Sequence, residues 1–127
     1  MNLKQITIYS DKPVETAAFF ELLGLKIIVN SLPRYARLEC PDGESTLSIN
    51  EYGPANLSLR NNIVLYFECE NLDADVERLK SLGLEFDEAP SDRTWLWREA
   101  YLKDPNGNKI CLFYAGQNRK YPSRRVK

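Results

Sequence analysis

The chain has 127 residues, of which 43% are hydrophobic and 28% are charged. This composition is typical of a soluble globular protein with one domain, or with two small modules that share a core. No apolar run approaches the roughly 20 residues of a membrane span, and no long apolar core follows residues 1–5, so we expect neither a membrane anchor nor a signal peptide. The net charge is −1 and histidine is absent, which excludes Ser-His-Asp, Cys-His and two-His-one-carboxylate sites.

The first half predicts a strand, a helix and three further strands. Alternation over 3–9 indicates the first strand. Pro13 is tolerated in the first turn of a helix that Asp11 or Lys12 caps. Gly24 ends this helix, because glycine adopts the left-handed cap without strain. Further strands are expected over 25–30, 34–40 and 45–52.

A polar linker over 53–61 leads to a second half with the same order. Asn71 is a good cap for a helix over 72–82, whose apolar residues form one stripe, and Gly83 ends it. An Asn-Gly pair within 104–108 is a strong hairpin signal between the last two strands. The strands of this half are expected over 62–69, 84–88, 94–103 and 108–115.

The order recurs because the sequence repeats itself. Leu23-Gly24-Leu25 returns as Leu82-Gly83-Leu84, a shift of 59 residues, and at this shift Ile6 falls on Leu65. A repeat of this length is one supersecondary unit used twice, and two such units that face each other leave a cleft suited to a ligand. We therefore predict a single domain over 1–127, made of module 1 (2–52), the linker (53–61), module 2 (62–116) and a basic tail (117–127).

These features resemble the vicinal oxygen chelate superfamily, which includes glyoxalase I, the extradiol dioxygenases, the fosfomycin-resistance enzymes and the bleomycin-resistance binding proteins. The resemblance covers 3–116. It rests on the paired β-α-β-β-β order, on the helix entry over 11–25, on Asn-Leu-Asp-Ala at 71–74 and above all on Asp-Pro-Asn-Gly-Asn at 104–108. The stretch over 95–100 resembles a metal-poor bacterial branch. The resemblance implies an α+β fold in which two tandem βαβββ modules form a cupped mixed sheet around a cleft.

Where such relatives hold a metal, the resemblance implies four ligands, from the first and fourth strands of each module. Here these positions are Gln5, Ser48, Val64 and Cys111. Glutamine can ligate, but serine is weak, valine cannot ligate, and a soft thiol replaces a hard carboxylate. A catalytic divalent ion normally has about three protein ligands. We therefore expect no metal and no cofactor, and none of the superfamily's metal-dependent reactions: hemithioacetal isomerisation, ring-cleaving oxygenation or thiol addition to an epoxide.

Strand alternation selects the side chains that face the predicted cleft. On the strand over 94–103, positions three and five before the Asp-Pro turn face the site in resembling enzymes, so Leu96 is expected beneath the helices. Arg98 then either pairs with a carboxylate or, if the register is wrong by one residue, lies in the cleft. The predicted ligand-binding residues are Gln5, Thr7, Tyr9, Ser48, Asn50, Tyr66, Trp97, Glu99, Tyr101, Cys111 and Phe113. The candidate catalytic bases are Glu99, Glu68 and Tyr101.

Cysteines and the tail carry less information. Cys40, Cys69 and Cys111 have no metal-like spacing and are expected to be reduced, buried thiols in a cytoplasmic protein. The five cations of the tail (117–127) follow an acidic body that would repel phosphate, so we expect no nucleic acid. The tail either folds back over an acidic surface or edges a pocket.

The sequence favours a metal-free protein that binds or sequesters a small, partly apolar molecule in an aromatic cleft and forms a homodimer, without a membrane partner. Two alternatives stay open. The first is an enzyme of lyase or dioxygenase type, with a carboxylate or Tyr base or an atypical metal at Gln5 with Glu99. The second is a protein-interaction module without a ligand, in which the aromatics fill the core and Trp95 and Trp97 anchor an interface.

Overall fold

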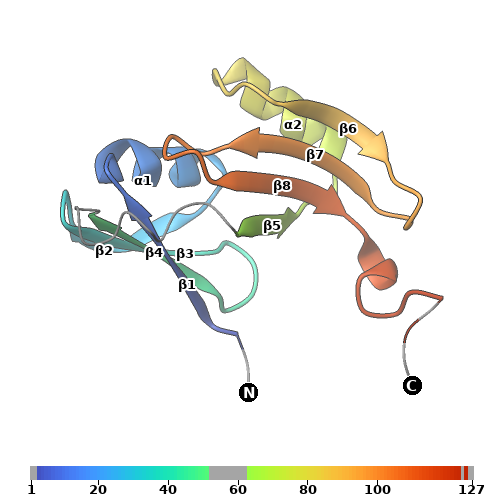
Figure 1. The fold of residues 1–127 in the computed structure, drawn as a ribbon, viewed down its shortest axis with the longest axis horizontal. Coiled ribbons are helices and arrows are strands. Elements are labelled where there is room, and N and C mark those ends of the chain that lie inside the picture. The colour runs from blue at the N-terminus through green and yellow to red at the C-terminus, as the bar shows by residue number, and fades with distance from the viewer. Residues whose placement is uncertain (1–2, 52–62, 124, 126–127) are drawn as a thin grey trace. The chain divides into compact units, whose positions relative to one another are not determined.

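The computed structural model describes residues 3–51, 63–123 and 125, and they form two βαβββ units (Figure 1). Unit 1 comprises 1–62 together with the turn 104–108, and unit 2 comprises 63–103 and 109–127. We describe each unit by itself. The predicted α+β class with two tandem βαβββ modules is confirmed. Among the described residues, no helix is long and apolar enough to cross a membrane.

Unit 1 is a four-stranded mixed sheet with one helix. Its strand order is β1-β4-β3-β2, in which β1 and β4 are parallel and the other neighbours are antiparallel. The described strand ends lie within two residues of the predictions. The elements are β1 (Gln5–Ser10), α1 (Pro13–Leu22), β2 (Lys26–Ser31), β3 (Tyr35–Glu39) and β4 (Thr46–Glu51).

The start and end of α1 follow from its flanking residues. Lys12 occupies the cap position but makes no side-chain cap hydrogen bond, and Pro13 begins the helix, where its missing N–H costs little. Gly24 follows the last turn with φ of 106°, a conformation that strains any residue with a Cβ. Phe20 is fully buried, so α1 contributes its apolar side to the core of unit 1.

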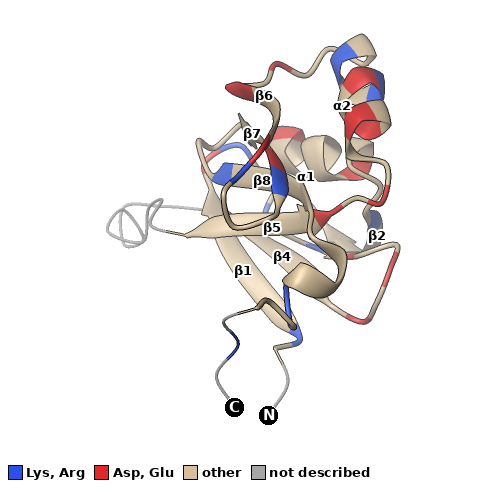
Figure 2. Cartoon of the chain, turned by 90° about the vertical axis from the view of Figure 1, so that its right-hand side faces the viewer, with Lys and Arg blue, Asp and Glu red and all other residues tan. Residues whose placement is uncertain are grey.

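Unit 2 repeats the topology, with strand order β5-β8-β7-β6 and a parallel β5–β8 pair. Asn71 caps α2 by position, without a side-chain hydrogen bond, and the predicted stripe of the helix is buried at Leu72, Val76 and Leu79. Acidic and basic residues occupy much of the rest of α2, where its ribbon is red and blue (Figure 2). The elements are β5 (Val64–Glu68), α2 (Leu72–Ser81), β6 (Glu88–Asp92), β7 (Arg98–Lys103), β8 (Lys109–Tyr114) and the 3-10 turn η2 (Gly116–Asn118).

Two predicted strands of unit 2 were misplaced. The strand expected over 84–88 begins only at Glu88, because ladder pairing with β7 starts at Glu88 opposite Tyr101. The strand expected over 94–103 begins at Arg98. The residues before it form a tight turn, in which the Arg93 N–H donates to the Trp97 carbonyl at 2.8 Å.

Leu96 lies in this turn and not beneath the helices as predicted. Its side chain is 67% exposed and its φ is 69°, a left-handed conformation that costs a non-glycine residue roughly 1–2 kcal/mol. The strand alternation that was used to place Leu96 does not hold for the residues before Arg98, because the chain reverses direction in the turn that they form. Strain of this kind persists only where surrounding contacts hold it.

Equivalent positions in the two units pair in the same way. Gln5 is opposite Thr46 in the parallel pair of unit 1, and Val64 is opposite Lys109 in the parallel pair of unit 2. The internal repeat therefore corresponds to a structural repeat, with a shift of 59 residues from β1 to β5 and from α1 to α2, and of 63 from Thr46 of β4 to Lys109 of β8.

The most specific motif of the sequence, at 104–108, builds a turn. Asp104 is 4% exposed, and its carboxylate accepts the N–H groups of Asn106 at 2.9 Å and Asn108 at 2.7 Å. The Asn108 side-chain amide donates to the same carboxylate at 2.8 Å. Gly107 has a φ of 83°, which only glycine adopts freely. These bonds give the motif a structural role.

Candidate functional site

The predicted site residues of unit 2 lie on one face of its sheet. Tyr66 and Tyr101 are both opposite Cys111, and Glu99 is opposite Phe113. Paired residues on neighbouring strands point to the same side of a sheet. From Arg98 onward, the β7 side chains predicted to face the same way, Glu99 and Tyr101, therefore lie on the face that carries Tyr66, Cys111 and Phe113. The other face carries the buried side chains of Leu65, Ala100, Leu102, Ile110 and Leu112.

Three aromatic rings pack together on this face. Trp97 stacks on Phe113, with centroids 4.7 Å apart and planes at 17°. Tyr66 meets both rings edge-on, 6.1 Å from Trp97 and 5.7 Å from Phe113. Phe113 is 3% exposed, whereas Tyr66 is 50% exposed and Trp97 is half-buried. Within the described residues, Phe113 therefore belongs to the core, and Tyr66 and Trp97 form the accessible aromatic surface.

A cavity of about 540 Å³, open to solvent, adjoins Trp97. One wall is the turn before β7, with Trp95, Leu96 and Trp97, and the other is the tail, with Asn118 and Arg119. The Trp97 indole N–H donates to the Asn118 carbonyl at 3.3 Å, which ties the two walls together. The tail thus edges a pocket, one of the two positions expected for it.

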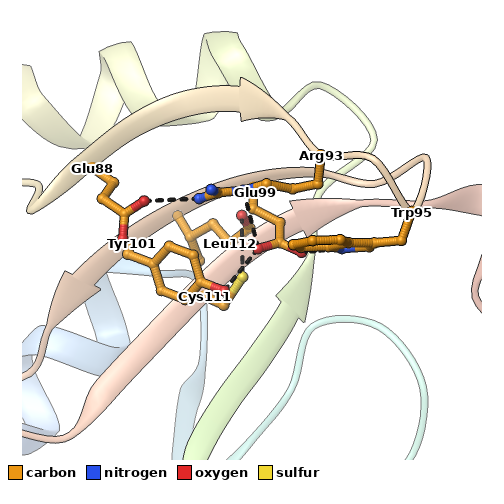
Figure 3. A network of polar contacts seen from close by, with 7 residues as sticks. All are labelled: Glu88, Arg93, Trp95, Glu99, Tyr101, Cys111 and Leu112. Atoms are coloured by element: carbon orange, nitrogen blue, oxygen red, sulfur yellow. Dashed lines mark hydrogen bonds and ion pairs between the residues drawn. The ribbon is translucent and has the colours of Figure 1, made fainter.

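Glu99 is the centre of a buried polar network (Figure 3). It is 2% exposed, and its two oxygens accept the Trp95 indole N–H and the Tyr101 hydroxyl, each at 2.7 Å. Arg93 Nε lies 3.5 Å from Glu99 without hydrogen-bond geometry. Arg93 also donates to Glu88 at 2.8 Å. A buried carboxylate is tolerated only with such partners.

These contacts restrict Glu99 and Tyr101 as general bases. Both oxygens of Glu99 already accept hydrogen bonds from within the protein. Burial, followed by the hydrogen bond to Glu99, raises the pKa of Tyr101 well above its ordinary value. The phenol is therefore a hydrogen-bond donor at neutral pH, and Glu99 is buried with both oxygens bonded within the protein, so neither group is placed to take a proton from a substrate.

Glu68, the third candidate base, holds the end of β8. One of its oxygens accepts the backbone N–H groups of Ala115 at 3.0 Å and Gly116 at 2.9 Å. These bonds satisfy two donors at the point where β8 leads into η2. The carboxylate therefore has a structural role in the described part of the chain.

Arg98 pairs with carboxylates, which is the first of the two arrangements predicted for it. Its guanidinium donates to Asp73 on α2 at 3.0 Å and to Asp92 on β6 at 3.0 Å. Arg98 is thus paired with carboxylates. Glu99, and not Arg98, lies on the face with Trp97.

The cysteines are free thiols, with Cys111 buried and Cys40 and Cys69 half-buried. Burial raises the pKa of Cys111 to about 11 and that of Cys69 to about 12. Both are protonated at neutral pH, whereas the nucleophile and the metal ligand is the thiolate.

The predicted residues of unit 1 also share a face, and this face contains two side chains that the prediction missed. Tyr35 and Arg37 of β3 are opposite Asn50 and Ser48 of β4. Ala36 and Leu38, which alternate with them, are fully buried, so alternation over 34–40 was the signal that could have found them. On β1, β3 and β4 the face comprises Gln5, Thr7, Tyr9, Tyr35, Arg37, Glu39, Thr46, Ser48 and Asn50.

Tyr35 links Ser48 and Arg37 on this polar face through hydrogen bonds. Its hydroxyl lies 2.8 Å from the hydroxyl of Ser48, which is 0% exposed, and accepts the Arg37 Nε–H at 2.9 Å. The hydrogen bond with Ser48, ahead of that from Arg37, lowers the pKa of Tyr35. The phenol proton is therefore more acidic than that of an ordinary tyrosine.

The four positions that the resemblance assigns to a metal are a poor donor set. Gln5 accepts a hydrogen bond from Thr46 at 3.0 Å, and Ser48 is bonded to Tyr35. Val64 has no donor atom, and Cys111 offers a soft thiol where a hard carboxylate is usual. Across residues 3–51, 63–123 and 125, no group of three or more His, Cys, Asp or Glu could hold a metal ion. The residues present do not fit the metal of the superfamily.

Comparison with known proteins identifies the fold. A model of the Glyoxalase/Bleomycin resistance protein/Dioxygenase superfamily matches residues 2–112. None of the curated proteins compared with the chain matches it.

Three solved structures illustrate the likeness, which at these identities shows the fold alone. One is a glyoxalase/bleomycin resistance protein/dioxygenase family enzyme from Burkholderia phytofirmans PsJN, with 22% identity and a TM-score of 0.74 over 91% of this chain and 99% of that one. A bleomycin-binding protein complexed with bleomycin has 22% identity and a TM-score of 0.69, over 90% and 98% of the two chains. A lactoylglutathione lyase from Agrobacterium tumefaciens has 16% identity and a TM-score of 0.70, over 89% and 92%.

Proposed function

Because the chain belongs to the glyoxalase/bleomycin resistance protein/dioxygenase superfamily, we propose that it binds or sequesters a small, flat, partly apolar molecule at Trp97 without a metal. The observation that carries this proposal is the open cavity of about 540 Å³ with Trp95 and Trp97 in one wall. Ligand pockets are typically about 300–1,000 Å³, with aromatic walls and few polar groups. A structural neighbour that is a bleomycin-binding protein in complex with bleomycin supports a binding role.

The walls suggest the chemistry of the ligand. The indoles offer flat apolar surface, and Arg119 and Ser123 line the same cavity. A planar molecule with one polar or negatively charged substituent fits this arrangement. The homodimer, the single-domain division and the cytoplasmic location stay predictions.

An enzyme of lyase or dioxygenase type is the alternative, because the superfamily includes both. The contacts of its candidate bases do not favour it, since Glu99 and Glu68 already accept hydrogen bonds and Tyr101 is a donor. Turnover that is lost on Glu99→Asp, in a variant that binds ligand normally, would favour the enzyme.

Nuclear magnetic resonance tests the proposal directly, because the chain has two tryptophans and hence two indole N–H signals. Flat aromatic probes, such as indole, quinoline and naphthoate, should include at least one that shifts the Trp97 signal in a saturable manner. Trp97→Leu should abolish this binding, whereas Tyr121→Ala should not, because Tyr121 is 64% exposed and outside the cavity walls. The proposal fails if no probe saturates, or if binding survives Trp97→Leu.

A further inference from the structure

Half-buried arginines in the described residues differ in how they are neutralised. Arg93 contacts Glu88 and Glu99, and Arg98 contacts Asp73 and Asp92. The third, Arg37, has no carboxylate within ion-pair distance in the described part of the chain; its one hydrogen bond goes to Tyr35. A cation withdrawn from water is costly without a counter-charge, so the surroundings of Arg37 call for an anion.

The guanidinium of Arg37 is held in a defined orientation. Its Nε–H donates to the Tyr35 oxygen at 2.9 Å, and Tyr35 is in turn fixed by the buried Ser48 at 2.8 Å. A guanidinium has five N–H donors. In Arg37 the four on the terminal nitrogens make no hydrogen bond to the described residues. These two nitrogens form the planar fork that matches the two oxygens of a carboxylate or phosphate.

The neighbouring side chains on β4 and β1 are polar and uncharged, and on the other side Arg37 is opposite Val29 of β2. In the sheet, Arg37 is opposite Ser48, and Ser48 is opposite Thr7; Asn50 lies one pair further along β4. Thr7 and Asn50 have no side-chain hydrogen bond to the described residues and can add donors. Glu39, two residues further along β3 on the same face, is exposed and forms no ion pair with Arg37 in the described part of the chain.

We propose that this face of unit 1 is an oxyanion site, in which Arg37, oriented by Tyr35 and Ser48, binds the carboxylate or phosphate group of a small molecule. The site lies within unit 1 and does not depend on a ligand at Trp97. Tyr35 and Ser48 act through Arg37 as positioning residues, while Arg37 contacts the anion. No metal takes part, because two planar oxygens and the fork of the guanidinium satisfy each other.

The test is a titration of the full chain with inorganic phosphate, acetate and benzoate at constant ionic strength, followed at the Arg37 Nε–H and at the amides of Ser48 and Asn50. Saturable shifts with phosphate alone would assign a phosphate site, and shifts with acetate and benzoate a carboxylate site. Arg37→Gln should weaken binding at least ~10-fold, as expected for loss of a charge-assisted pair. The matched control is Arg34→Gln, three residues earlier and exposed, which should change affinity less than ~2-fold.

A second variant separates positioning from folding. Tyr35→Phe keeps the charge of Arg37 and the bulk of the ring but frees the guanidinium, so binding should weaken severalfold while the amide spectrum of unit 1 stays folded. The inference is overturned if none of the three anions gives a saturable shift, or if Arg37→Gln binds as tightly as the parent. Because the readout lies in unit 1, a negative result here is distinct from a negative result at Trp97.

Discussion

Trp95 donates its indole N–H to the buried carboxylate of Glu99 at 2.7 Å, although the tryptophan itself is 46% exposed. The bond joins the strained turn before β7 to the polar network around Glu99 (Figure 3). The same turn supplies Trp97 to the proposed ligand cavity. The turn that lines the cavity is therefore hydrogen-bonded to a buried carboxyl group that does not itself line it.

Glu99→Gln should lower the free energy of unfolding by about 1–3 kcal/mol. The amide places an N–H where an oxygen accepted from Trp95 or Tyr101, so one buried donor loses its acceptor. Chemical denaturation measures the loss. Glu88→Gln is the matched control, because Glu88 is 48% exposed in its ion pair with Arg93, and it should cost less than about 1 kcal/mol. Equal costs for the two variants would contradict a central role for Glu99.

Leu96→Gly should raise the free energy of unfolding by up to about 1 kcal/mol. Glycine relieves the left-handed backbone at φ 69°, and little packing is lost because the leucine is 67% exposed. Leu96→Ala, which keeps the strain, should change stability by less than about 0.5 kcal/mol. A clear loss of stability in Leu96→Gly would mean that the leucine side chain is packed in solution.

Trp97→Ala should cost less stability than Leu102→Ala and still abolish probe binding. Leu102 is 0% exposed, and its truncation should cost about 2–5 kcal/mol. Trp97 is half-buried on a surface beside an open cavity, so part of its area is already in water. Thermal and chemical unfolding give the comparison. If Trp97→Ala is the more damaging of the two, the indole is core and not a ligand wall.

Alkaline pH should destabilise the fold through Cys111. Its pKa rises from 9.0 to about 11 on folding, so between these values the unfolded chain has released a proton that the native chain still holds. Stability contributed by the neutral thiol is fully present below pH 9 and is lost as pH rises toward 11, by at most about 2–3 kcal/mol. Cys69, with a pKa raised to about 12, adds to the same trend.

The slope of unfolding free energy against pH isolates this effect. In Cys111→Ala the slope above pH 9 should be shallower than in the parent, although the cavity lowers stability at every pH. An unchanged slope would show that Cys111 is ionised or solvated in the native protein.

Most of unit 1 could be predicted because local signals agreed there. Pro13 and Gly24 mark the helix ends, and buried Ala36 and Leu38 alternate with polar neighbours. Arg37 was nevertheless missed as a site residue, because the choice of residues followed the metal positions of the superfamily and not the alternation of β3. The sequence does not show which arginine lacks a carboxylate.

Unit 2 shows where sequence reasoning fails. Trp95 and Trp97 alternate like strand residues, yet they lie in a turn that closes between Arg93 and Trp97. Once that turn is in place, Trp95 reaches Glu99, four residues ahead. The burial and partners of Glu99 depend on this reversal, which no periodicity reveals. The face of β7 was assigned from the resemblance, through the positions of Glu99 and Tyr101 before the Asp-Pro turn, and alternation alone would not have found it, because Glu99 and Ala100 are both buried.

The central claim is that a flat ligand binds at Trp97 and needs no metal. The most direct measurement is the affinity of the best aromatic probe for untagged protein, titrated once in EDTA and once with added zinc, nickel or manganese. We expect the same affinity within about twofold in all conditions, and loss of binding in Trp97→Leu throughout. Binding that is absent in EDTA and restored by one of these ions would contradict the claim.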